Sequence, residues 1–90
     1  MAEFIKEVDE RLPKLKTFKE SSDMPNYAII VHAIKSDCKY LGIMDLADLA
    51  YEHELKSKED DIDYVDSNYD ALIEKINHYT KICKEYLGKE

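Results

Sequence analysis

Apolar residues recur every three or four positions through most of this chain, which is the spacing of one face of an α-helix. Short polar or acidic segments divide the pattern into four stretches, which predict helices over about residues 2–19, 24–41, 43–58 and 61–87. The apolar run at residues 27–31 is no strand, because its pattern continues at helical spacing. Four amphipathic helices joined by short connections pack as antiparallel neighbours. We therefore expect an all-α, up-and-down four-helix bundle that forms a single domain over residues 1–90.

A few residues with special backbone preferences place the ends of these helices. Asp23 is a good N-cap, and Pro25 follows it in the first turn of the second helix. Gly42 is placed to end that helix. Pro13 lies inside the first helical stretch, where a proline removes a backbone donor and crowds the preceding turn. We therefore expect the first helix to be kinked or split at Pro13.

Composition and charge exclude several classes of function. The chain has 90 residues and a formal net charge of −7, so it has no overall basic footprint for nucleic acid or for an anionic membrane surface. No apolar run approaches the length needed to cross a membrane. Cys38 and Cys83 form no CxxC motif, which argues against a disulfide framework or a zinc site. We expect a soluble, cytoplasmic, monomeric protein with reduced thiols.

One histidine in the second predicted helix points away from the core. A helix turns by ~100° per residue, which places His32 ~150° from the centre of the apolar stripe of that helix. Ser36 and Lys39 lie on the same outward arc, and Lys35 lies at its edge. The pattern therefore predicts an exposed histidine with lysines close by.

An exposed histidine with lysines close by is typical of a histidine that carries a phosphoryl group. A neutral imidazole is a nucleophile near pH 7, and phosphoryl transfer depends mainly on positioning and on charge neutralisation. Lys35 and Lys39 are placed to offset the phosphoryl charge, while the small Ser36 leaves the ring of His32 accessible. Ile29 lies one turn before the histidine, where an exposed apolar side chain suits a docking partner. The alternative for Ile29 is an exposed residue without a role, since single exposed apolar residues are common.

At these residues the chain resembles the histidine-containing phosphotransfer (HPt) domain family. The family motif is His-x-Leu-Lys-Gly, with a further glycine ten residues after the histidine. His32, Ile34, Lys35 and Gly42 match it, with isoleucine in place of leucine. The pattern of the next family helix is matched by Leu46, Leu49, Ala50 and Glu54. The resemblance covers roughly residues 4–87, and the family fold agrees with the four predicted helices.

The chain departs from the family pattern at two positions. Ser36 stands where the family usually has a glycine, four residues after the histidine. His53 stands where the family usually has an apolar residue, often leucine. We expect His53 to be partly buried and satisfied by a neighbour, with pH sensing as the alternative role.

The resemblance implies a phosphorelay intermediate rather than an enzyme. His32 would accept a phosphoryl group from a receiver aspartate or a kinase and pass it to a receiver aspartate. The implied partners are a response-regulator receiver domain and a hybrid histidine kinase. The family has no ATP site and needs no cofactor of its own, because the required Mg²⁺ belongs to the receiver. Consistent with this, the chain lacks a glycine-rich phosphate loop.

Two alternatives remain open at this point. One is an HPt-like bundle that binds a signalling partner and is never phosphorylated on His32. The other is a metal site, which ligand spacing disfavours because there is no i,i+4 histidine pair and no paired cysteines. Its candidate ligands are His32, His53, His78, Cys38 and Cys83.

Overall fold

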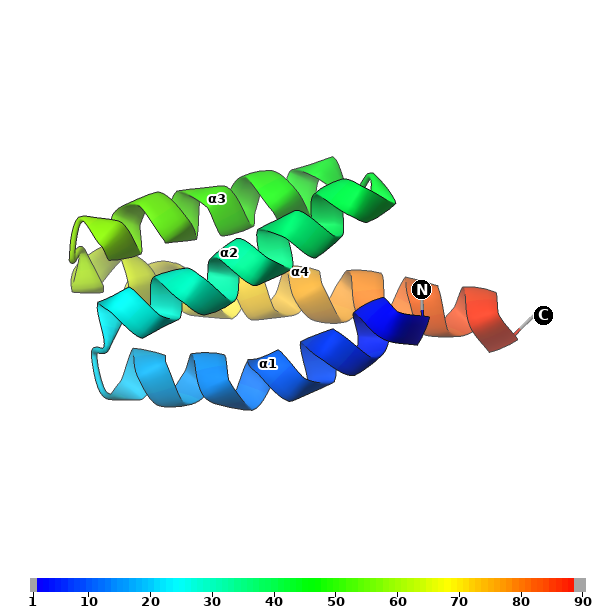
Figure 1. Cartoon of the computed structure of the whole chain (residues 1–90), viewed down its shortest axis with the longest axis horizontal. Coiled ribbons are helices and arrows are strands. Elements are labelled where there is room, and N and C mark those ends of the chain that lie inside the picture. The colour runs from blue at the N-terminus through cyan, green and yellow to red at the C-terminus, as the bar shows by residue number, and fades with distance from the viewer. Residues whose placement is uncertain (1, 89–90) are drawn as a thin grey trace.

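The computed structural model of this chain describes residues 2–88 and forms a four-helix bundle. The helices are α1 (Ala2–Glu20), α2 (Met24–Leu41), α3 (Met44–Lys58) and α4 (Ile62–Gly88), and no strand occurs among the described residues. Each helix runs antiparallel to the next, and α4 projects beyond the other three (Figure 1). The predicted all-α, up-and-down bundle is confirmed, and every helix end lies within one residue of its predicted position.

The four helices pack in a ring, and the α2–α3 pair is the most extensive contact. α1 also packs on α2 and on α4, and α3 packs on α4. The shared interior is filled by apolar side chains that are almost completely shielded from solvent, which is the dominant stabilising contribution in a small domain. They include Val8, Leu15, Tyr27, Val31, Ile34, Cys38, Leu46, Ala50, Val65, Leu72, Ile76 and Cys83.

Both ends of α2, the helix that bears His32, are defined by local interactions. The Asp23 side chain accepts a hydrogen bond from the backbone amide of Asn26, at 3.4 Å, as a predicted N-cap should. At the other end Gly42 adopts φ +78°, and the Ile43 amide donates to the Cys38 carbonyl at 2.9 Å. This left-handed conformation favours glycine, and it reverses the chain directly into α3.

Pro13 does not split the first helix. α1 runs unbroken from Ala2 to Glu20 with Pro13 inside it, so the expectation of two consecutive helices is wrong, while a kink at this position stays a prediction. Pro13 is exposed, and so is Asp9, whose carbonyl loses its partner when proline replaces an amide donor. Water can satisfy that carbonyl at the surface, which reduces the cost of the proline.

Candidate functional site

His32 lies in the middle of α2 on the outer surface of the bundle. Its side chain is 57% exposed, in agreement with the outward direction expected from helical geometry. Ser36 is exposed one turn further along α2, and Ile29 is 64% exposed one turn before the histidine. The structure therefore places these three residues on one surface of α2.

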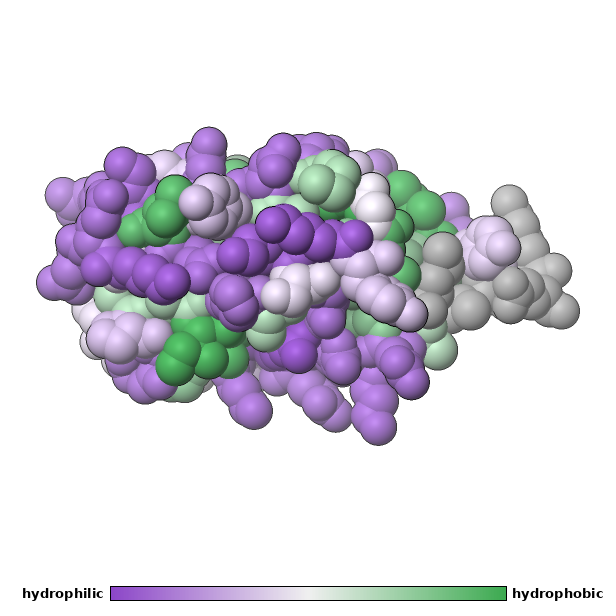
Figure 2. Space-filling model, turned by 45° about the horizontal axis from the view of Figure 1, so that its top comes forward, coloured by the Kyte–Doolittle hydropathy of each residue, from purple (hydrophilic) through white to green (hydrophobic). Residues whose placement is uncertain are grey.

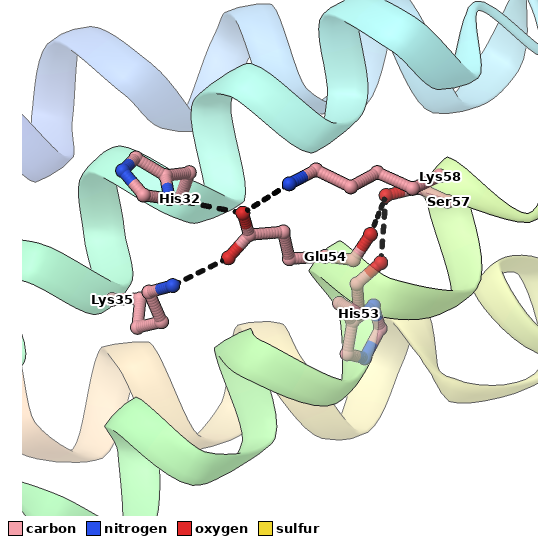
Figure 3. A network of polar contacts seen from close by, with 6 residues as sticks. All are labelled: His32, Lys35, His53, Glu54, Ser57 and Lys58. Atoms are coloured by element: carbon pink, nitrogen blue, oxygen red, sulfur yellow. Dashed lines mark hydrogen bonds and ion pairs between the residues drawn. The ribbon is translucent and has the colours of Figure 1, made fainter.

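The group that organises this surface is Glu54 of α3, which is only 3% exposed. Its carboxylate forms hydrogen bonds or ion pairs with three side chains, those of His32, Lys35 and Lys58 (Figure 3). His32 Nδ1 lies 2.9 Å from Oε2, Lys35 Nζ lies 2.6 Å from Oε1, and Lys58 Nζ lies 2.9 Å from Oε2. One carboxylate thus joins two residues of α2 to one residue of α3.

The spacing within each helix makes this arrangement possible. His32 and Lys35 are three residues apart on α2, and Glu54 and Lys58 are four residues apart on α3, so each pair shares one helix face. The buried Ser57 hydroxyl between them donates to the carbonyls of His53 and Glu54, at 2.7 and 3.0 Å. It therefore needs no partner outside α3 and leaves the carboxylate free for its cationic neighbours.

The electrostatics of Glu54 determine which nitrogen of His32 is free. Burial alone raises the pKa of Glu54, but the hydrogen bonds from Lys35, Lys58 and His32 outweigh it and lower that pKa to about 2. Glu54 is therefore ionised at neutral pH and can only accept hydrogen bonds. His32 Nδ1 must carry the hydrogen that it donates to Glu54. In the neutral ring Nε2 is then unprotonated, and it points away from Glu54 (Figure 3).

The three lysines near this site occupy different environments. The Lys35 side chain is 12% exposed and is paired with Glu54, and its Nζ lies 5.0 Å from the centre of the Tyr51 ring. Its ammonium group is therefore mostly buried. The Lys58 side chain is 62% exposed and can reach beyond Glu54. Lys39 is exposed two turns from His32, about 10 Å along the helix axis. Lys39 makes no hydrogen bond or ion pair with the described residues of the site.

A groove of about 680 Å³ opens beside His32, between the first half of α2 and the end of α3. Its lining is mainly apolar on the α2 side, and Glu54 and Lys58 lie along its other edge. Apolar patches are visible as isolated green areas on the largely hydrophilic face of Figure 2. The α2 side of the groove is formed by Met24, Pro25, Ala28, Ile29 and His32.

Glu54 and Lys58 could not be found by examining the outward face of α2 alone. They follow His32 by 22 and 26 residues in the sequence, and they reach it only because α3 folds back along α2. Glu54 matched the family pattern of the third helix, but that match did not indicate a contact with His32. The one local signal is the i,i+4 pair of opposite charges on α3.

His53 lies beneath this surface and is completely buried, more than the partial burial expected. Its Nδ1 is 2.9 Å from the Tyr27 hydroxyl, while Nε2 has no hydrogen-bond partner in residues 2–88. Burial lowers the pKa of His53 to about 4, although the Asn68 backbone and Glu52 act in the opposite direction. His53 is therefore neutral and is satisfied at one of its two nitrogens.

The remaining candidate metal ligands do not gather into a site. Cys38 and Cys83 are buried in the core as free thiols, and His78 is exposed on α4. Within residues 2–88, no group of three or more His, Cys, Asp or Glu side chains could hold a metal ion. The structure therefore adds no support to the metal alternative.

Comparison with known proteins gives one informative match. Residues 1–79 match the family of the Hpt domain. No curated protein and no solved structure matches the chain. Among the described helices, none is long and apolar enough to cross a membrane.

Proposed function

Because the chain belongs to the Hpt domain family, we propose that it carries a phosphoryl group on His32 in a two-component phosphorelay. Hpt domains are phosphocarrier modules that work with receiver domains and histidine kinases. The observation that carries the proposal is the 2.9 Å contact between His32 Nδ1 and the buried Glu54 carboxylate. This contact leaves the outward nitrogen of an exposed histidine as the nucleophile.

The transfer step follows from this geometry. Nε2 of His32 attacks the phosphorus of a phosphorylated receiver aspartate. The N–P bond forms as the P–O bond breaks, and the receiver aspartate leaves as a carboxylate with the electron pair. The Nδ1 hydrogen stays on the ring, which becomes positively charged, and the adjacent Glu54 carboxylate offsets that charge. The reverse step returns the phosphoryl group to a receiver aspartate.

The three lysines have different electrostatic roles in this proposal. Lys58 has a largely exposed side chain and comes from the helix opposite His32, so it is the cation best placed to offset the charge of the phosphoryl group. Lys35 is held between Glu54 and Tyr51, and its role is to keep the carboxylate ionised and in position. Lys39 lies further along α2, where it suits a contact with the partner rather than with the phosphoryl group.

The groove beside His32 supplies a docking surface for the receiver domain. Its apolar α2 side includes the exposed Ile29, and burying such a side chain against a partner is favourable. The receiver would contribute the Mg²⁺, so this chain would need no cofactor of its own. A cytoplasmic location and a monomeric state stay predictions from the sequence.

A phosphotransfer assay tests this function directly. The chain is mixed with phosphorylated receiver domains, and we expect an acid-labile, base-stable phosphate to appear on it. His32→Gln should abolish this label and leave the receiver phosphorylated. His78→Gln is the matched control, because His78 is also exposed but lies on α4, and it should transfer at the wild-type rate.

Two results would contradict the proposal. If the receiver loses its phosphoryl group to His32→Gln as fast as to the wild type, His32 is not the acceptor. If a receiver binds the chain but no phosphate is ever transferred, the chain is a non-phosphorylated interaction module, which is the alternative function.

A further inference from the structure

A buried polar pair joins α2 to α3 directly beneath the site. Tyr27 and His53 are both fully shielded from solvent, and the Tyr27 hydroxyl lies 2.9 Å from His53 Nδ1. The His53 ring also packs edge-on against Tyr64 of α4, with 5.3 Å between the ring centres. The pair is thus enclosed by three helices, and it joins two helices, whereas the buried Ser57 and Thr80 hydroxyls bond only to carbonyls of their own helix.

A buried hydrogen bond stabilises one axial position of α3 along α2 over its neighbours, whereas apolar contacts do so only weakly. Apolar side chains can slide by a residue and still exclude water, since burial is non-directional. A buried hydroxyl and a buried imidazole must meet within hydrogen-bond distance, or both are left unpaired at a cost. Burial raises the pKa of the Tyr27 hydroxyl, so it stays protonated and can donate to His53 Nδ1. The observed axial position pairs the hydroxyl with Nδ1 of His53, and a shift of α3 along α2 would leave both atoms unpaired.

The functional residues depend on that same position. His53 directly precedes Glu54 on α3, and Tyr27 lies five residues before His32 on α2. The buried contact between Tyr27 and His53 and the surface contact between His32 and Glu54 therefore bridge the same two helices, each at 2.9 Å. A displacement of α3 along α2 would break both contacts together.

We propose that Tyr27 and His53 are positioning residues, whose hydrogen bond fixes the register of α3 on α2 and so holds the Glu54 carboxylate against Nδ1 of His32. The effect on phosphotransfer rests on the proposed function, whereas the effect on the His32 ring does not. The pair acts through Glu54 and has no contact with the reacting atoms.

The test replaces the polar pair by an apolar one, using the double variant Tyr27→Phe/His53→Leu. Replacing both partners of a buried hydrogen bond can leave stability almost unchanged, so the effect on His32 can be separated from unfolding. The ¹⁵N NMR signals of His32 are recorded at about pH 8, where free histidine is neutral. The wild type should show one tautomer with hydrogen on Nδ1, and the double variant should show a mixture of tautomers.

A transfer assay provides the second measurement. Loss of register should slow transfer from a phosphorylated receiver by roughly 10- to 100-fold, because small misplacements of reacting groups are costly. Tyr79→Phe is the matched control, since the Tyr79 hydroxyl also donates across helices, to Asp45 at 2.6 Å, but away from the site. It should change neither the His32 tautomer nor the rate. If the double variant does not fold, Tyr27→Phe alone removes only the hydroxyl and takes its place.

The outcomes separate this inference from the proposed function. A single Nδ1–H tautomer and an unchanged rate in the folded double variant would overturn the positioning role. A mixture of tautomers in the variant supports that role even if no receiver phosphorylates the wild type, in which case the proposed function alone fails. A mixture of tautomers in Tyr79→Phe as well would also overturn the inference, because the effect would then not be specific to this pair.

Discussion

His53→Leu should remove most of the acid sensitivity of this bundle between about pH 7 and pH 5. Burial lowers the pKa of His53 from 6.5 to about 4 in the folded chain, so near pH 5 the unfolded chain binds nearly one more proton than the folded chain. The resulting stability is fully present above pH 6.5 and is lost as the pH falls towards 4. At about 1.4 kcal/mol per pKa unit, acidification from about pH 7 to pH 5 should lower the free energy of unfolding by about 2 kcal/mol.

Urea denaturation followed by circular dichroism measures this loss. The free energy of unfolding is determined at both pH values for the wild type, for His53→Leu and for His78→Leu. The wild type and the His78 variant should show the same loss, because the His78 side chain is exposed, and the His53 variant should show a much smaller one. The reasoning is refuted if the wild type shows no loss, or if His53→Leu loses as much stability as the wild type.

Three further substitutions test separate parts of the structure. Glu54→Ala leaves the mostly buried Lys35 without its carboxylate and should lower the free energy of unfolding by roughly 2 kcal/mol in urea titrations; an unchanged midpoint would contradict the pairing. Lys58→Ala should slow transfer to His32 about fivefold, which corresponds to about 1 kcal/mol, and added salt should reduce the difference from the wild type. Equal slowing by Lys39→Ala would show that distance from the ring is unimportant. In Gly42→Ala the added Cβ has no atom within 4 Å, but residue 42 must still adopt φ +78°, so the free energy of unfolding should fall by about 1 kcal/mol in thermal or urea unfolding. Gly42→Asn should lower it by less, because asparagine tolerates this left-handed conformation better.

The properties that depend on one helix could be predicted from the sequence. The outward direction of His32, the cap at Asp23 and the end at Gly42 all follow from geometry within α2, and each is observed. The expected split at Pro13 is wrong, because Pro13 and the Asp9 carbonyl that it deprives of a donor lie on the exposed face of α1. At an exposed position, water compensates for the missing hydrogen bond.

The partners of His32 depend on two helices and could not be predicted in the same way. Glu54 meets the ring only in one relative rotation and axial position of α2 and α3, which the apolar stripes do not define. The same limitation applies to Lys58, which comes from α3 and pairs with Glu54 beside Lys35, whereas the outward face of α2 alone indicates only Lys35 and Lys39. His53 departs from the family pattern in the sequence, but its complete burial and its contact with Tyr27 arise only from the packing of α2 on α3.

The two core thiols have a practical consequence for studying receiver docking. Cys38 and Cys83 are both buried, which shields their thiols from maleimide and methanethiosulfonate reagents in the native chain, and burial also raises the pKa of Cys38 to about 12. A cysteine introduced at Tyr40, which is 91% exposed near the end of α2, would therefore be labelled selectively. A spin label or fluorophore at that position can report the approach of a partner to the His32 surface without removal of the native cysteines.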